Sequence, residues 1–201
     1  MTFKLHDLKE GDIDDSVFSN LILEGFNEKF THKLYAKHSV EHFSRALANY
    51  YYANAQIIFI LEGEEVCGCI VLSNQNVKIT HLLRHFFEYS LGIADCFRAL
   101  FLVMLLSHRV ANSECYIEML VVRSIDQGRG FGNRLIEEAQ NRLAIDKTLT
   151  LYVTNKNKAA YYLYKKKEFH LEKIIYSRVS EYIMGVSKWS FMRYRKDSSD
   201  D

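Results

Sequence analysis

The chain has 201 residues, of which 48% are hydrophobic, and its 26 Lys and Arg nearly balance its 25 Asp and Glu. This length suits one well-buried core, so we expect a single domain over residues 1–201. A formal net charge of +1 does not indicate a broad nucleic-acid or anionic-membrane surface. The first residues include Lys4, His6, Asp7 and Glu10 and hold no uninterrupted apolar region of the signal-peptide type, which indicates a cytoplasmic protein.

Hydrophobic periodicity divides the chain into strands and helices. The elements predicted first are a strand at 3–8, helices at 16–30 and 39–52, and strands at 56–61 and 65–72 that meet in a tight hairpin at Gly63. Strands at 115–123, 148–154, 171–176 and 189–194 follow, with helices beginning at Gly130 and Asn157 between them. The pattern predicts a mixed α/β sheet.

A strongly apolar helical segment is predicted from about 77 to 110. Its most apolar part contains Phe97, Leu100, Phe101, Val103, Met104, Leu105 and Leu106. Asp95 and Arg98 leave no uninterrupted run of transmembrane length, so no membrane-spanning helix is expected. The apolar side chains must still be buried somewhere. Added core, a homodimer contact, a lid over a substrate pocket and a helix on a membrane surface all stay open.

No metal site is expected from the cysteines and histidines. Cys67, Cys69, Cys96 and Cys115 have no paired metal-ligand spacing and are interpreted as buried free thiols. Two pairs of histidines have helical spacing but lack the intervening glutamate of a metalloprotease motif. The sequence shows no Ser, His, Asp order typical of a nucleophilic triad either.

The most informative segment is 122–133, where a predicted strand runs into a glycine-rich turn and then a helix. Gly128, Gly130 and Gly132 allow a sharp turn and let backbone amides approach a ligand at the positive end of the helix dipole. Such a turn suits a pyrophosphate. The phosphate-loop motif does not fit, because Asn133 and Arg134 follow the last glycine in place of Lys and Ser or Thr.

This segment resembles the central motif of the GNAT superfamily of N-acetyltransferases. The motif positions are Leu120 and Val122 at the strand end, then Gln127, Gly130 and Gly132. A proline often follows the valine in the family, and Ser124 stands in its place. The resemblance implies a central mixed, largely antiparallel sheet flanked by helices and splayed at the strand before the turn. Relative to the family, the segment at about 77–110 is a helical insertion.

A second block carries the same resemblance. Asn157, Ala160, Leu163, Tyr164 and Phe169 match the later Asn, Ala, Leu, Tyr, Gly, Phe pattern of the family at its spacing. Only the glycine is missing, because Glu168 occupies its position. The order and separation of the two blocks are also those of the family.

The resemblance implies acetyl-CoA as cosubstrate and a primary amine as acceptor, attacked directly in a ternary complex. The residues implied to bind the coenzyme are Leu120, Val121, Val122, Gln127, Gly128, Arg129, Gly130, Phe131, Gly132, Asn157 and Tyr164. Strand backbone would align the pantetheine arm, and amides of the turn would hold the pyrophosphate. Arg129 is expected either to add charge there or to be solvated.

Tyr164 is the predicted general acid, since the matching family tyrosine lies near the coenzyme sulfur and a phenol can protonate a leaving thiolate. Glu118 is the predicted base, acting directly or through water. Strand alternation would put it on the same face as Leu120 and Val122, close to the acceptor. Tyr116, two residues earlier on that strand face, is the second candidate for the base.

The acceptor is not identified by the sequence. Its pocket is expected from residues 26–52 and from the insertion, with His32, Tyr35 and His38 as candidates. Two other functions stay open. One is a non-catalytic acyl-CoA-binding module on the same fold, and the other is an assembly subunit built on the apolar insertion.

Overall fold

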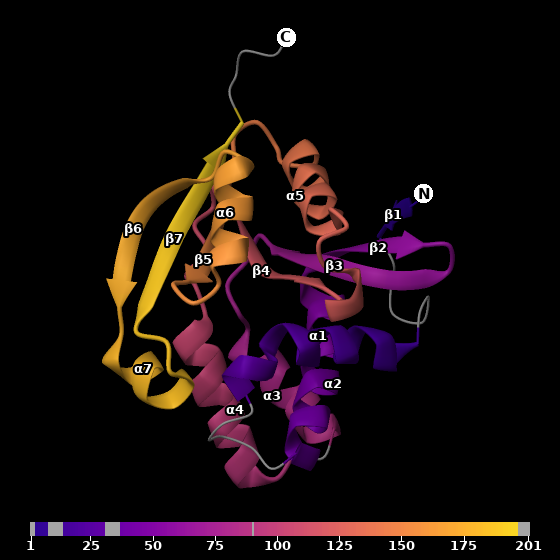
Figure 1. Cartoon of the computed structure of the whole chain (residues 1–201). Coiled ribbons are helices and arrows are strands. Elements are labelled where there is room, and N and C mark those ends of the chain that lie inside the picture. The colour runs from indigo at the N-terminus through magenta and orange to yellow at the C-terminus, as the bar shows by residue number, and fades with distance from the viewer. Residues whose placement is uncertain (1–2, 8–13, 31–36, 90, 197–201) are drawn as a thin grey trace.

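The computed structural model describes residues 3–7, 14–30, 37–89 and 91–196. Seven strands form one sheet in the order β1-β2-β3-β4-β5-β7-β6 (Figure 1). The strands are β1 (Phe3–His6), β2 (Gln56–Glu62), β3 (Glu65–Ser73), β4 (Glu114–Val122), β5 (Thr148–Thr154), β6 (His170–Tyr176) and β7 (Lys188–Arg195). The helices are α1 (Asp15–Phe30), α2 (Lys37–Asn54), α3 (Ile79–Glu88), α4 (Ile93–Leu106), α5 (Phe131–Asn141), α6 (Lys158–Lys166) and α7 (Arg178–Met184), with a 3-10 turn at Ser124–Asp126.

The sheet is mixed and largely antiparallel, as expected. Only β4 and β5 run parallel, and their pairing extends from Glu114 opposite Thr148 to Tyr116 opposite Thr150 and no further. Beyond Tyr116 the two strands diverge, although β4 stays paired with β3 up to Val122 and β5 stays paired with β7 up to Thr154. The splay predicted before the glycine turn is therefore present, and it leaves two strand edges facing each other without bonds between them.

Helices cover both faces of the sheet (Figure 1). On one face, α1 to α4 pack over a core that includes Phe18, Phe43 and Phe59. On the other, α5 and α6 cover a second core that includes Leu135 and Phe169. The diverging ends of β4 and β5 lie between these two layers, so a cleft there can be reached by side chains from both.

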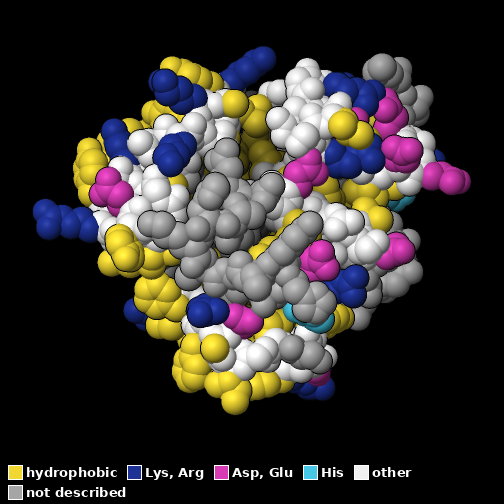
Figure 2. All heavy atoms as spheres, turned by 60° about the horizontal axis from the view of Figure 1, so that its bottom comes forward, with side chains coloured by type: hydrophobic (Ala, Val, Ile, Leu, Met, Phe, Trp, Pro, Cys, Tyr) yellow, Lys and Arg dark blue, Asp and Glu magenta, His cyan; other side chains and the backbone are white. Residues whose placement is uncertain are grey.

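The apolar insertion forms α3 and α4, which confirms its predicted helical character. One face of α4 is part of the core through Cys96, Ala99 and Leu102. Its other face exposes large side chains, Ile93, Phe97, Phe101 and Met104. Figure 2 is turned so that the lower helices of Figure 1 come forward. In this view hydrophobic side chains gather along the left and lower parts of the surface. No helix within the described ranges has the length and apolarity needed to cross a membrane.

The helix α7 was not predicted. It has seven residues between β6 and β7 and begins after Ser177, whose side chain accepts a hydrogen bond from the Ser180 amide at 3.1 Å. Gly185 ends it with a left-handed φ of 66°. About two helical turns carry too little periodicity to be recognised, although the serine cap and the glycine stop were visible in the sequence.

Candidate active site

The glycine turn has the backbone that its composition predicted. Gly128 and Gly130 adopt φ values of 79° and 86°, a region that side chains rarely enter. Gly130 is the N-cap of α5 and provides no side-chain acceptor for the first helical turn. The amides that open α5 are thus left for an outside acceptor, at the end of the helix where a phosphate is favoured.

A cleft of about 830 Å³ lies where β4 and β5 diverge. It is lined by residues 117–122 of β4 and 151–154 of β5, and further by Glu24, Gly25, Ser124, Gln127, Lys156, Asn157, Ala160, Tyr164, Met184, Gly185 and Val186. Of the residues predicted to bind the coenzyme, Leu120, Val121, Val122, Gln127, Asn157 and Tyr164 line this cleft. The two diverging strands therefore form opposite walls of the cleft, with residues of α6 and the segment 184–186 beside them.

The other predicted binding residues, from Gly128 to Gly132, do not line the cleft but form the turn beside Gln127. Within this turn the side chain of Phe131 is 5% exposed and belongs to the core under α5. Only its backbone is left for a ligand. Gly132 has a packing role, because a Cβ there would lie 3.2 Å from Leu163 of α6.

Arg129 holds the turn to the β2–β3 hairpin. Its guanidinium donates to Glu62 at 2.6 and 2.7 Å and to Asp126 at 2.7 Å. Arg123 donates to the other oxygen of Asp126 at 2.6 Å. Burial alone would raise the pKa of Asp126, but the bonds from both arginines outweigh it and lower that pKa. The side chain of Arg129 is thus engaged in ion pairs and does not line the cleft.

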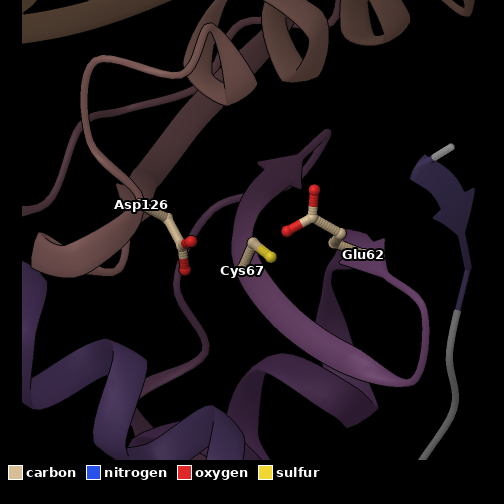
Figure 3. A group of neighbouring side chains, drawn as sticks. All are labelled: Glu62, Cys67 and Asp126. Atoms are coloured by element: carbon tan, nitrogen blue, oxygen red, sulfur yellow. The ribbon is translucent and has the colours of Figure 1, made fainter. Parts of the chain in front are cut away.

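Glu62, Cys67 and Asp126 form a cluster in which the ligand atoms lie within 4.8 Å of one another (Figure 3). Both carboxylates already pair with guanidinium groups, Glu62 with Arg129 and Asp126 with Arg123 and Arg129. Burial raises the pKa of the Cys67 thiol, which keeps it neutral. The cluster is therefore explained as an anchor for the turn, without a metal ion.

Asn157 and Tyr164 lie on α6 as the sequence indicated. The Asn157 side chain caps the helix by accepting from the Ala160 amide at 3.0 Å. Tyr164 is buried, and its ring packs 5.6 Å from that of Phe169. Burial raises the pKa of Tyr164 above its ordinary value, so the phenol that lines the cleft keeps its proton near neutral pH.

A β-bulge in β4 changes the expected position of Glu118. Val71 pairs with Met119 and the next residue, Leu72, pairs with Ile117, so Glu118 has no partner on β3. Residues that follow the bulge are shifted to the opposite face relative to those before it. The expectation of regular alternation through Glu118 was therefore wrong.

The two sides of β4 show the consequence of the bulge. Leu120 and Val122 pack on the core under α5, whereas Met119 and Val121 belong to the core under α1 and α2. Glu118 instead lines a second cavity, whose walls include residues of α2. It faces the helices of the first layer and does not share a face with Leu120 and Val122.

This second cavity has a volume of about 280 Å³. It is lined by Phe43, Leu47, Tyr50, Tyr51, Val77, Leu82, Leu102, Val103, Ser107, Tyr116, Glu118, Tyr152, Ile175, Ser177, Ser180 and Trp189. Glu118 and Tyr152 also line the larger cleft, so the two spaces meet there. Burial raises the pKa of Glu118 from 4.5 to about 7. Half of this carboxyl population is ionised near neutral pH, where a base is most useful.

Comparison with known proteins agrees with this geometry. The sequence matches the family model described as Acetyltransferase (GNAT) family over residues 20–169. The chain belongs to the GNAT acetyltransferase family. No curated protein is found to match the sequence.

Solved structures share the GNAT fold over nearly the whole chain. An N-acetyltransferase from Staphylococcus aureus Mu50 is 17% identical with a TM-score of 0.68, covering 95% of this chain and 100% of its own. A structure described as histone acetyltransferase HPA2 and related acetyltransferase from Corynebacterium glutamicum is 15% identical with a TM-score of 0.67 and full coverage of both chains. A GNAT family acetyltransferase from Elizabethkingia anophelis, with acetyl-CoA bound, is 13% identical with a TM-score of 0.59, covering 96% and 98%.

The two departures from the GNAT motifs have structural consequences. Ser124, at the position of the family's proline, donates through its amide and its hydroxyl to Glu24 of α1. A proline has no amide hydrogen to give, so this tie between α1 and the end of β4 depends on the departure. Glu24 was missed by sequence reasoning, and the serine at a proline position was the available signal.

Glu168, at the position of the family's glycine, adopts a left-handed φ of 63°. Its amide donates to the Lys165 carbonyl at 3.1 Å and the Phe169 amide donates to the Tyr164 carbonyl at 3.0 Å, which is a Schellman ending for α6. The backbone geometry of the glycine is thus kept by a side chain that disfavours it.

The structure also bears on the predicted acceptor pocket and adds a residue that was not predicted. Lys156, which was not predicted, is a cation on the wall of the larger cleft. Among the acceptor candidates, His32 and Tyr35 lie outside the described residues, as does the side chain of His38. The segments expected to build the acceptor pocket do contribute to the smaller cavity, through Phe43 of α2 and Leu102 of α4, for example.

Proposed function

We propose that this GNAT protein transfers an acetyl group from acetyl-CoA to a primary amine, by direct attack in a ternary complex. The observation that carries the proposal is the junction of two spaces at Glu118 and Tyr152. One space is a long cleft with unpaired strand edges, and the other is a small side-chain pocket. This arrangement suits a thioester and an amine that approach each other from opposite sides of β4.

The larger cleft suits the coenzyme. The β4 edge at Leu120 and Val122 can pair with the amide groups of the pantetheine arm as with an added strand. Amides of residues 127–132 and the start of α5 offer donors for the pyrophosphate. Lys156 adds a positive charge on the cleft wall. These groups bind and orient the cosubstrate without any metal.

The chemistry then needs one base and one acid. Glu118 removes the proton from the ammonium form of the acceptor, either directly or through water, because its pKa lies at about 7. The amine nitrogen forms a bond to the acetyl carbon, and the carbon–sulfur bond breaks. Tyr164 donates its proton to the departing sulfur, since burial keeps the phenol protonated. The second proton of the attacking nitrogen then passes through water to the Tyr164 phenolate, and the proton held by Glu118 is released to solvent, so the products are the amide and the CoA thiol.

The first test is a calorimetric titration with acetyl-CoA of the unaltered protein and two glycine variants. Gly130→Val forces a β-branched side chain onto a φ of 86° in the turn and should weaken binding by about a hundredfold or more. Gly92→Val adds the same side chain at an open position, the N-cap of α4, away from the turn, and is the control. It should retain binding, with circular dichroism checking that both variants are folded.

The second test follows thiol release from acetyl-CoA with a panel of primary amines. Transfer to at least one amine, with N-acetylation shown by mass spectrometry, would support the proposed activity. Saturable acetyl-CoA binding without transfer to any amine would favour the non-catalytic acyl-CoA-binding function instead. Equal acetyl-CoA binding by the Gly130→Val variant would contradict the assignment of the turn.

A further inference from the structure

The smaller cavity has unusually apolar walls for an acceptor site. Six of the lining side chains are aromatic: Phe43, Tyr50, Tyr51, Tyr116, Tyr152 and Trp189. Aliphatic side chains of α2, α3 and α4 complete it, among them Leu47, Leu82, Leu102 and Val103. Such walls favour a ligand with apolar surface, because removing the apolar surfaces of the ligand and of the walls from water contributes most of the affinity.

Several polar groups on these walls already have partners within the protein. The Tyr50 hydroxyl accepts from the Lys78 amide at 3.0 Å, and the Trp189 indole donates to the Ser180 hydroxyl at 3.1 Å. That hydroxyl in turn donates to the Val186 carbonyl at 2.6 Å. The Ser107 hydroxyl donates to the Met104 carbonyl at 3.1 Å. Among the described lining residues, the phenols of Tyr51, Tyr116 and Tyr152 and the Glu118 carboxylate remain for a ligand. These groups are too few for a ligand with hydroxyl or amide groups along its whole length.

One charge interrupts the apolar lining. Glu118 is the only formally charged side chain among the described residues that line the cavity. Within those described ranges, no donor or cation is bonded to its carboxylate. A single ammonium group can therefore be balanced at the junction with the larger cleft, whereas a second ammonium deeper in the cavity would be buried without a partner.

We infer that the acceptor is a small primary monoamine with a compact hydrophobic body, alkyl or aryl, and not a polyamine, an aminoglycoside or a peptide. The body lies between α2 and α4, and the amino group lies at Glu118. The volume of about 280 Å³ is at the lower end for ligand pockets, which fits a small molecule of this class. This inference rests on the proposed acetyl transfer, which it makes specific.

Binding can be measured apart from turnover. Trp189 is the only tryptophan of the chain and lines the cavity, so its fluorescence reports occupancy. 2-Phenylethylamine, titrated with and without CoA, should produce a saturable change. Spermidine, kanamycin and a lysine-containing peptide should produce none at the same concentrations. In the transfer assay, kcat/KM for 2-phenylethylamine should exceed that of each polar amine by about tenfold or more.

A pair of neighbouring variants on α4 tests the location. Val103→Phe adds volume to a half-buried side chain of the cavity wall and should weaken 2-phenylethylamine by about tenfold, while n-propylamine, a smaller probe, changes less. Met104→Phe changes the next residue, whose side chain is 62% exposed, and should leave both amines within about twofold. Equal effects of the two variants would overturn the location.

The outcomes separate this inference from the proposed function. Preferred acetylation of spermidine, kanamycin or the peptide would overturn the substrate class and leave acetyl transfer standing. A saturable fluorescence response to 2-phenylethylamine without transfer to any amine would support the cavity assignment and count against the transferase activity. The inference would be overturned if apolar monoamines produced no fluorescence change and were not acetylated.

Discussion

The two spaces that meet at Glu118 are built in different ways. The larger cleft lies along the facing edges of β4 and β5, and its important feature is the missing pairing between these two strands. The smaller cavity is made of side chains from α2, α3, α4, α7, β4, β5, β6 and β7 and from the segments beside them. Hydrogen bonds from an unpaired strand edge come from the backbone and tolerate many side chains, whereas a wall made of side chains changes with each substitution.

The difference indicates how one fold can keep its coenzyme and change its acceptor. Substitutions in the cleft should affect all acceptors alike, because they act on the shared cosubstrate. Substitutions in the cavity should discriminate between acceptors. Glu118 and Tyr152 line both spaces and are expected to combine the two effects.

Tyr164→Phe should produce the largest change on the cleft side. Removing the proton donor should lower kcat by about a hundredfold for every amine, with acetyl-CoA affinity within about threefold. Steady-state kinetics and calorimetry measure the two quantities. Tyr162→Phe, at a 67% exposed position on the same helix, is the control and should be active. Unchanged kcat in the Tyr164 variant would remove the acid role.

Glu118→Gln should lower kcat/KM at pH 8 by about tenfold or more and abolish the pH dependence near 7. In the unaltered enzyme the base must be ionised, so kcat/KM should rise with pH through about 7 and level above it. A profile that keeps this inflection in the glutamine variant would assign it to another group.

The same variant should be more stable than the unaltered protein at pH 8. Burial raises the folded-state pKa of Glu118 from 4.5 to about 7, so the folded state binds this proton more tightly than the unfolded state. The resulting stabilisation is complete below about pH 4.5 and is lost as the pH rises through 7. Thermal melts should show a gain on the order of 1–3 kcal/mol at pH 8, and none at pH 4.

Arg129→Ala should have a smaller effect on the coenzyme than Lys156→Ala. The Arg129 guanidinium is paired with Glu62 and Asp126, whereas Lys156 lines the cleft. We expect a loss of acetyl-CoA affinity below about threefold for the first and of about fivefold to tenfold for the second at low salt. A reversed order would mean that Arg129 leaves its ion pairs to bind phosphate.

Glu168→Gly should have the smallest effect and the opposite sign. Glycine adopts the φ of 63° without the clash that glutamate meets, so unfolding should require about 0.5–1 kcal/mol more, with unchanged kinetics. Lys165→Gly, within α6, is the matched control and should destabilise by a similar amount. Chemical denaturation measures both. Destabilisation by Glu168→Gly would show that its side chain has a contact worth more than the strain.

The features that the sequence predicted well are local. The positive φ values of Gly128 and Gly130 follow from residue type, and the cap at Asn157 follows from a side chain that reaches an amide three residues away. The family motifs also indicated where β4 and β5 would diverge. The glycine conformations and the cap depend on neighbours within a few positions along the chain, whereas the divergence of the two strands was implied by the family resemblance.

The features that were missed depend on distant partners. The bulge at Glu118 arises from the register between β3 and β4, which no single strand reveals. The pairing of Arg129 requires Glu62, and the tie at Ser124 requires Glu24, 100 positions earlier. A charged side chain has many candidate partners in a sequence, and only the fold selects among them.

The anchoring of the glycine turn has a consequence for protein engineering. Arg129 holds the turn to the β2–β3 hairpin through Glu62, 67 positions away, and Arg123 holds it through Glu65, so the loss of one arginine leaves the other tie in place. A graft of residues 122–133 onto another strand and helix would carry the glycines and leave their support behind. To transfer this anion-binding turn to another protein, a designer would have to include the tip of the β2–β3 hairpin, because the two segments form one structural unit.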